Sequence, residues 1–174
     1  ADIHVVNNRG FTSTMIASQK GHDQVVQCLL SSGAKVDAAT PDGETALITA
    51  SQQGHAKVVK TLLSAGADVN AARIDGVTSL IKASEKGYLD IVELLLTHGT
   101  EVNHTWRASK QGQTLTAATT ALANGHLACL RLLFKAGADL TIGSPSTFEY
   151  DTAPNASRYS PACVAFVEQA RQAT

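Results

Sequence analysis

The sequence lacks an excess of charge of either sign, because its 14 lysines and arginines nearly balance its 15 aspartates and glutamates. Proteins that bind nucleic acids through phosphates need a basic surface, so the sequence predicts no nucleic acid partner. It also lacks the apolar run of about 18 residues that a membrane-spanning helix needs. No cationic segment followed by an apolar signal core opens the chain. We therefore expect no membrane insertion and a location in the cytoplasm or nucleus.

Cysteines and catalytic motifs are also scarce. The three cysteines, Cys28, Cys129 and Cys163, are an odd number without the spacing of a metal site. We interpret them as free thiols in a reducing compartment rather than as disulfides or metal ligands. No glycine-rich phosphate loop follows a strand pattern, and no Ser, His and acidic residues stand out as a triad. The sequence predicts neither an enzyme nor a bound cofactor.

What the sequence does contain is a repeat with a period of 33 residues. This interval separates the members of two sets of glycines and of one set of leucine pairs. They are Gly10, Gly43 and Gly76; Gly21, Gly54 and Gly87; and Leu29-Leu30, Leu62-Leu63 and Leu95-Leu96. A fixed period of this length indicates stacked copies of one unit, each of which buries its apolar face against the next.

The copy at residues 40–72 shows the unit most clearly. Residues 41–43, Pro-Asp-Gly, predict a tight turn, and Thr45 stands where its hydroxyl can cap a short helix of small residues. Gly54 ends that helix, and the next apolar residues recur at the spacing of a second helix with one apolar face. We expect a turn, two helices and a hairpin arm in each unit, with Leu62 buried between the second and third units.

The order of these residues resembles the ankyrin repeat family: Gly-x-Thr, Ala, Gly-His, paired Val, paired Leu, Gly-Ala and a final Asn. The resemblance implies an all-α solenoid of stacked helix-turn-helix units with hairpin loops. The first residues match the end of a repeat, so we expect a piece of a larger array. We divide the chain into the tail of a truncated preceding repeat (1–6), repeats at 7–39, 40–72 and 73–105, a fourth repeat with an enlarged hairpin (106–143), and an irregular loop with a degenerate capping repeat (144–174).

The period lengthens once, because 38 residues separate Gly87 from Gly125. The additional residues fall around Trp106 to Lys110, so the only tryptophan lies in an enlarged hairpin between the third and fourth repeats. Insertions in solenoids commonly enlarge the binding edge, and tryptophan often dominates interface energetics. The alternative is that Trp106 folds back to cover the gap left by the insertion.

In proteins that resemble this one, partners lie along the hairpin tips and the inner helices. We therefore predict a monomeric, non-catalytic module that binds a protein or peptide on this concave surface. One alternative is a small-molecule or nucleotide sensor that stacks its ligand on Trp106, and another is a structural spacer in a larger protein. The predicted contact residues are Phe11, Asp42, Glu44, Ile74, Asp75, Val77, Lys82, Lys86, Trp106, Arg107 and Leu115.

Histidines and asparagines recur in the repeats as well. His22, His55 and His126 each follow a glycine at the same place in a repeat, which favours a structural role over metal binding. The resemblance also implies that Asn70 and Asn103 could be hydroxylated by a cellular dioxygenase. The alternative is a purely structural use, in which these amides satisfy backbone groups of the hairpins.

Overall fold

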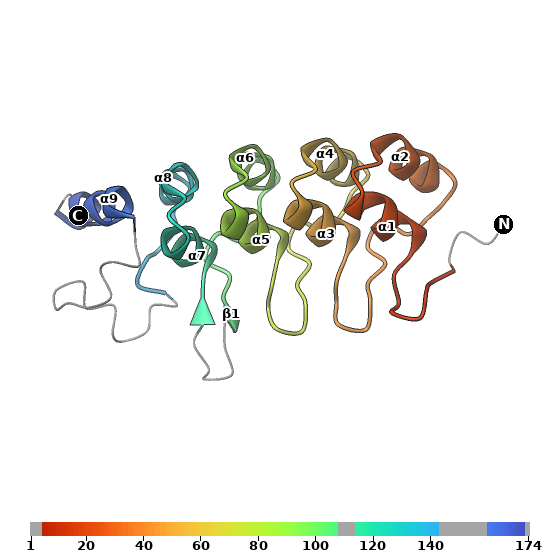
Figure 1. Ribbon diagram of the computed structural model, residues 1–174, viewed down its shortest axis with the longest axis horizontal. Coiled ribbons are helices and arrows are strands. Elements are labelled where there is room, and N and C mark those ends of the chain that lie inside the picture. Colours follow the sequence, from red (N-terminus) through yellow and green to blue (C-terminus); the bar gives the residue numbers. More distant parts are fainter. Residues whose placement is uncertain (1–4, 108–113, 143–159, 173–174) are drawn as a thin grey trace.

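The chain forms a solenoid of helix pairs, described here from a computed structural model at residues 5–107, 114–142 and 160–172. Figure 1 shows two parallel rows of helices, with hairpin loops that extend beyond one row. The inner helices, next to the hairpins, are α1 (Ser13–Gln19), α3 (Ala46–Gln53), α5 (Ser79–Lys86) and α7 (Ala117–Ala123). The outer helices are α2 (Asp23–Ser31), α4 (Ala56–Ser64), α6 (Leu89–Thr97) and α8 (Leu127–Lys135), and α9 (Pro161–Gln172) follows α8.

A threonine caps the start of every inner helix, as expected for Thr45. Its hydroxyl accepts a hydrogen bond from the backbone N–H three residues later, which would otherwise lack a partner at the helix start. The inner helices then pack side by side, and small buried alanines in their middle turns allow the close approach. The caps are Thr12, Thr45, Thr78 and Thr116, and the central alanines are Ala17, Ala50, Ala83 and Ala121.

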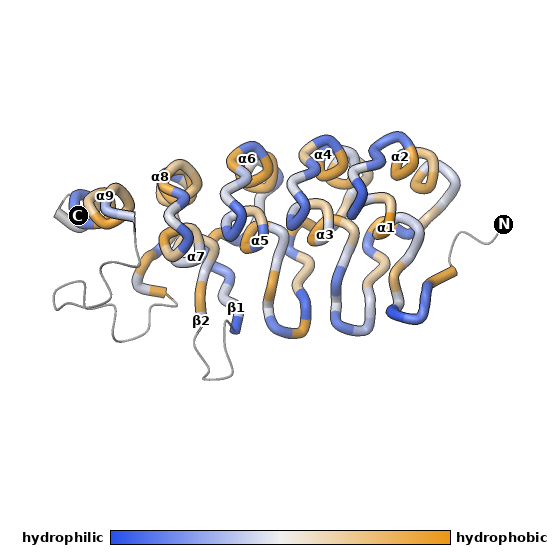
Figure 2. The backbone as a smooth tube through the Cα atoms, viewed as in Figure 1, coloured by the Kyte–Doolittle hydropathy of each residue, from blue (hydrophilic) through white to orange (hydrophobic). Residues whose placement is uncertain are grey.

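The core lies between the two rows of helices. Leu62, Leu95 and Leu133 occupy the same place on α4, α6 and α8, and each has no exposed surface. Figure 2 shows apolar positions along the helices and mostly polar positions at the ends of the hairpins. The predicted solenoid and the burial of Leu62 are therefore confirmed.

The hairpins stack on one another through glycines and backbone hydrogen bonds. Gly43 has φ +83°, and a Cβ atom there would lie 3.0 Å from the carbonyl oxygen of Ala72 in the next hairpin. A side chain would therefore be both strained and obstructed at this place. The backbone N–H of Ile74 donates to the carbonyl of Asp42 at 3.0 Å, and that of Arg107 donates to the carbonyl of Asp75 at 2.9 Å.

The enlarged hairpin differs from the others by a short pair of strands. The strands β1 (Trp106–Arg107) and β2 (Thr114–Leu115) are antiparallel, with Trp106 opposite Leu115. The residues between them, 108–113, lie outside the described ranges and include most of the predicted insertion. This two-stranded sheet is a small departure from an all-α fold.

The last helix packs on α8 in an orientation that the 33-residue period does not predict. The period makes Ala162 equivalent to Cys129 and Phe166 equivalent to Leu133. In the structure Cys129 and Leu133 are buried, whereas Ala162 is exposed and Phe166 is half-buried, with its ring edge-on to Phe134. The buried residues of α9 are Cys163 and Val167. Most of the predicted irregular loop before α9 falls on residues 143–159, and most of the predicted tail of a preceding repeat falls on residues 1–4. Both ranges lie outside the described residues.

None of the helices within the described ranges has both the length and the apolar character needed to cross a lipid bilayer.

Candidate functional site

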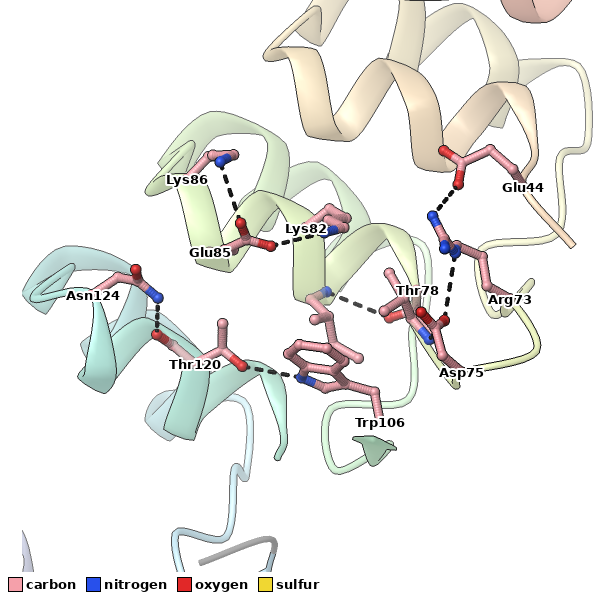
Figure 3. A network of polar contacts seen from close by, with 12 residues as sticks. Glu44, Arg73, Asp75, Thr78, Lys82, Glu85, Lys86, Trp106, Thr120 and Asn124 are labelled. Carbon is pink, nitrogen blue, oxygen red and sulfur yellow. Dashed lines mark hydrogen bonds and ion pairs between the residues drawn. The ribbon is translucent and has the colours of Figure 1, made fainter. Parts of the chain in front are cut away.

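An ion-pair network joins the second and third hairpins at the edge of the inner helices (Figure 3). The guanidinium of Arg73 donates to the Glu44 carboxylate at 2.8 Å and lies 3.4 Å from the carboxylate of Asp75. The hydroxyl of Thr49 on α3 also donates to Glu44, at 3.1 Å. Because the Glu44 side chain is largely buried, these bonds compensate for its lost hydration and fix the two hairpins to each other.

The tips of these hairpins carry an exposed apolar residue among charges. The side chain of Ile74 is 81% exposed, more than that of any other large hydrophobic residue in the described ranges. Asp42 and Arg107, on the neighbouring hairpins, are exposed as well. Since the backbone N–H of Ile74 is bonded to the carbonyl of Asp42, the backbone that carries this apolar side chain is fixed to the neighbouring hairpin.

A groove of about 430 Å³ lies between the first two hairpins. Phe11 and Pro41 provide its apolar walls, and Arg9, Asp42 and Arg73 are among its charged lining residues. The groove opens beside the Arg73 network and has a mixed apolar and charged character.

The surface of α5 carries two lysines on either side of a glutamate. Lys82 Nζ lies 2.9 Å from one carboxylate oxygen of Glu85, and Lys86 Nζ lies 3.2 Å from the other. Burial raises the pKa of the Glu85 carboxyl, but hydrogen bonds and charge from Lys82 and Lys86 outweigh this, so its pKa lies below the ordinary value of 4.5. The cluster thus keeps a net positive charge at neutral pH.

Trp106 lies between α5 and α7 rather than at the end of its hairpin. Its indole N–H donates to the hydroxyl of Thr120 on α7 at 3.3 Å, and the half-buried ring packs against the core. The Thr120 carbonyl in turn accepts a bond from the Asn124 side chain at 2.8 Å. Figure 3 shows the indole of Trp106 directed toward Thr120. This arrangement is closer to the alternative in which Trp106 folds back than to a fully exposed anchor, although the residue is only half-buried.

The structure places most of the predicted contact residues on one surface, but not all of them face outward. Val77 is 2% exposed and Glu44 is 9% exposed, so the prediction that they contact a partner is corrected. Val77 lies just before the cap of α5 and turns into the stack, and Glu44 is engaged by Arg73 and Thr49. The exposed members are Asp42, Ile74, Lys86 and Arg107, and the half-buried ones are Phe11, Asp75, Lys82, Trp106 and Leu115.

Two residues of this surface were absent from the predicted contact set. Arg73 bridges two acidic residues, and Glu85 holds the two lysines of α5 together. The 33-residue period offers one signal for Arg73, because this residue occupies the place of Trp106 in the next repeat. The period also places Glu85 on the inner helix of its repeat, beside Lys82 and Lys86, although it does not indicate their ion pairs.

The recurrent histidines join neighbouring repeats. His55 Nε2 lies 3.1 Å from the carbonyl oxygen of Gln19 at the end of α1, and His126 Nε2 lies 3.0 Å from that of Glu85 near the end of α5. Each ring satisfies a carbonyl that the preceding inner helix leaves without a partner. No group of three or more His, Cys, Asp or Glu in the described ranges could hold a metal ion. The hydrogen bonds of His55 and His126 agree with the structural role predicted for them, whereas His22, at the same place in the first repeat, is exposed.

Asn70 and Asn103 also link one repeat to the next. The side-chain oxygen of Asn70 accepts from the backbone N–H of Glu101 at 2.8 Å, and that of Asn103 accepts from the N–H of Asp139 at 2.8 Å. Both side chains are half-buried, and both thereby satisfy a backbone group of the following repeat. Their hydroxylation stays a prediction.

Comparison with known proteins points to one family. A family model described as ankyrin repeats, with three copies, matches residues 1–73 and again residues 71–144. A search of curated proteins finds no matching sequence.

Proposed function

The chain belongs to the ankyrin repeat family, and from this premise we propose that it binds a partner protein or peptide along its hairpin tips and inner helices. Ankyrin repeats are generally protein–protein interaction modules and are typically not enzymes. The proposed contact surface runs from the first groove to the enlarged hairpin. It comprises Phe11, Asp42, Ile74, Asp75, Lys82, Lys86, Trp106, Arg107 and Leu115.

The observation that carries this proposal is the exposure of Ile74. Surface hydrophobic residues are common singly, but this one is 81% exposed and stands among charged side chains on a hairpin fixed by hydrogen bonds and ion pairs. Because the backbone at Ile74 is already ordered, a partner that covers this side chain does not have to order the hairpin as well. Ile74 is therefore the proposed central anchor.

The charges around Ile74 give the surface its selectivity. Asp42 and Asp75 lie beside it at the hairpins, whereas Lys82 and Lys86 lie on α5 around Glu85. The hairpins also carry Arg73 and Arg107, so they present both signs of charge. A partner with acidic groups toward α5 complements the net positive cluster there. We expect such charges to affect the association rate and its salt dependence more than the affinity.

The alternative of a nucleotide sensor receives less support from the geometry of Trp106. The ring is partly packed against the core, and its N–H is already bonded to Thr120. A stacked base could use only the part of the Trp106 ring that the core leaves exposed. We therefore keep protein binding as the proposed function.

The proposal is tested by replacing Ile74 with aspartate and comparing the proteins captured by the parent and the variant in quantitative pull-down experiments. Any specific partner is then purified, and its affinity is measured by calorimetry. The matched control is Leu89→Asp, since Leu89 is 42% exposed on α6, away from the hairpins. We expect Ile74→Asp to weaken binding at least tenfold, and Leu89→Asp to leave it unchanged.

Equal binding by the parent and the Ile74→Asp variant would contradict the anchor. A loss of binding with Leu89→Asp alone would move the site to the outer helices. A surface that captures no specific partner would favour the spacer alternative.

A further inference from the structure

A second groove lies on the outer face of the stack, away from the hairpins. It runs between α2 and α4, which are neighbours in the outer row (Figure 1), and has a volume of about 590 Å³. Small side chains keep it open, because Ser31 lines it on α2 and Ser64 and Ala65 line it at the end of α4. Leu30, which is half-buried, adds an apolar patch to the α2 wall.

The next outer helix does not repeat these small side chains. On α6, Thr97 and the following His98 take the places of the two small residues at the end of α4. The Thr97 hydroxyl donates to the carbonyl of Leu94 at 2.8 Å, and Nδ1 of His98 lies 2.8 Å from the same oxygen. By contrast, the hydroxyls of Ser31 and Ser64 have no hydrogen bond within the described part of the chain, so both are free for a ligand.

The groove also carries unpaired positive charge. Lys57 and Lys60 line its α4 wall and are exposed, and no ion pair within residues 5–107, 114–142 and 160–172 involves either of them. Asp23 is the acidic residue of the lining, and its carboxylate already accepts from the Thr61 hydroxyl at 2.5 Å and from the Gln27 amide at 3.3 Å. Two lysines against one aspartate leave the lining with a net charge of +1.

The surface on the other side of α4 has the opposite charge. On α6, the exposed residues Asp90 and Glu93 stand at the places of Lys57 and Lys60. A negatively charged ligand that crossed α4 toward α6 would therefore meet like charge, which confines it to the groove. Both the charge and the free hydroxyls of this groove belong to one pair of repeats and not to the 33-residue period.

From these observations we propose that the groove between α2 and α4 binds an extended acidic segment of a partner protein. Two carboxylate side chains of the segment lie beside Lys57 and Lys60, and one apolar side chain lies against Leu30. The free hydroxyls of Ser31 and Ser64 form hydrogen bonds with the backbone of the segment. This site is on the outer face of the stack, and the proposal does not rest on the partner binding proposed for the hairpin tips.

The dimensions of the groove favour an extended segment over a helix. The helices α2 and α4 have nine residues each, which corresponds to a length of about 13 Å. This length matches about four residues of an extended chain. A docked amphipathic helix would need a long apolar groove, whereas the walls here are mainly polar.

The test uses the blocked peptide Glu-Ala-Glu-Leu-Glu-Ala-Glu as the probe, because it presents carboxylates next to an apolar residue in either chain direction. It is titrated into the isotope-labelled chain, and amide NMR spectra report both the site and the affinity. The control peptide has glutamine in place of each glutamate. We expect the acidic peptide to shift the amide signals of α2 and α4, and the control peptide to bind about fivefold more weakly or less.

Charge removal is tested with two matched double variants. Lys57→Gln with Lys60→Gln removes both charges from the groove, and Lys20→Gln with Lys135→Gln removes the same charge from places outside its lining. We expect the first pair to weaken binding of the acidic peptide about five- to tenfold, and the second pair to weaken it less than about twofold. Circular dichroism checks that each variant keeps its helical content.

The space in the groove is tested without changing its charge. Ser64→Tyr places a large side chain in the groove, and Thr97→Tyr places one at the same position of α6. Ser64→Tyr should weaken binding of the acidic peptide about fivefold or more, because the ring occupies the volume that the segment needs. Thr97→Tyr should leave the affinity unchanged.

Equal weakening by the two lysine pairs would overturn the proposal, because the attraction would then be a general effect of charge. Failure of the parent chain to bind the acidic peptide, or shifts confined to α5 around Lys82 and Lys86, would overturn it as well. Sedimentation tests a second copy of the chain as the competing occupant, since its α6 carries acidic residues. A dimer that Lys57→Gln with Lys60→Gln dissociates would place that copy in the groove instead of a partner segment.

Discussion

Two glycines at the ends of inner and outer helices allow the packing between repeats to be measured separately from backbone strain. Gly87 follows α5 with φ +75°, and Gly99 follows α6 with φ +77°. A Cβ atom at Gly87 would lie 2.5 Å from Nδ1 of His126, whereas a Cβ atom at Gly99 would have no atom of the described residues within 4 Å apart from Gly99 and its chain neighbours. Gly87→Ala and Gly99→Ala therefore impose nearly the same strain, but only Gly87→Ala displaces the imidazole.

The expected costs follow from these contacts. A left-handed conformation costs an alanine about 1–2 kcal/mol, and this is partly offset because alanine restricts the unfolded chain. We expect Gly99→Ala to lower the free energy of unfolding by about 1 kcal/mol. Gly87→Ala should cost about 1–2 kcal/mol more, because His126 loses its bond to the Glu85 carbonyl and its packing on the helix end.

The assay is urea denaturation followed by far-ultraviolet circular dichroism, on the two glycine variants, His126→Ala and the double variant Gly87→Ala with His126→Ala. Once the imidazole is absent, the added alanine should cost no more than it does at Gly99. The double-mutant cycle should then give a coupling energy of about 1–2 kcal/mol. Equal costs for Gly87→Ala and Gly99→Ala, or additive effects in the double variant, would refute the role of His126 in joining the repeats.

Three further results are expected. Leu62→Ala should lower the free energy of unfolding by about 2–5 kcal/mol, because Leu62 is fully buried, whereas Leu89→Ala at a 42% exposed place should cost less than about 1 kcal/mol in the same titration. The lowered pKa of Glu85 means that the folded protein favours the ionised carboxylate over the protonated acid. This carboxylate therefore stabilises the fold at pH values above the ordinary pKa of 4.5, and the stabilisation is lost as the pH falls through the pKa of Glu85 in the folded state. Denaturation of the parent and Glu85→Gln from pH 7 to pH 3 should therefore converge at acid pH, and a constant difference would contradict the ion pairs with the two lysines. A maleimide should label the exposed Cys28 in the folded protein, whereas Cys129, whose thiol pKa is raised by burial and by the charge of Asp90, should react only on unfolding, as mass spectrometry would show.

Some features of the binding surface could be predicted from the sequence and others could not. The exposure of Ile74 and Asp42 follows from their place in a turn between repeated helices, and the structure agrees. The burial of Val77 could not be predicted from the period, because its equivalents in the other repeats differ: Glu44 is buried, whereas Phe11 and Leu115 are half-buried. The exposed fraction of the side chain at this position of the repeat depends on how each hairpin packs on the next. The 33-residue period does not indicate that packing.

The sequence by itself determined the repeating unit. Threonine caps, glycine turns and an apolar stripe ending in leucine pairs act within a few residues of each other, so they specify two helices and a hairpin wherever they recur. The tertiary structure decided how the units meet. Arg73 reaches Glu44, 29 residues earlier in the sequence, and Val25 stays exposed where Val58 is covered. A long polar side chain such as that of Arg73 has many possible partners, and the exposure of an apolar residue depends on what packs against it. The ion pair of Arg73 and the exposure of Val25 were therefore decided only by the stacking of the repeats.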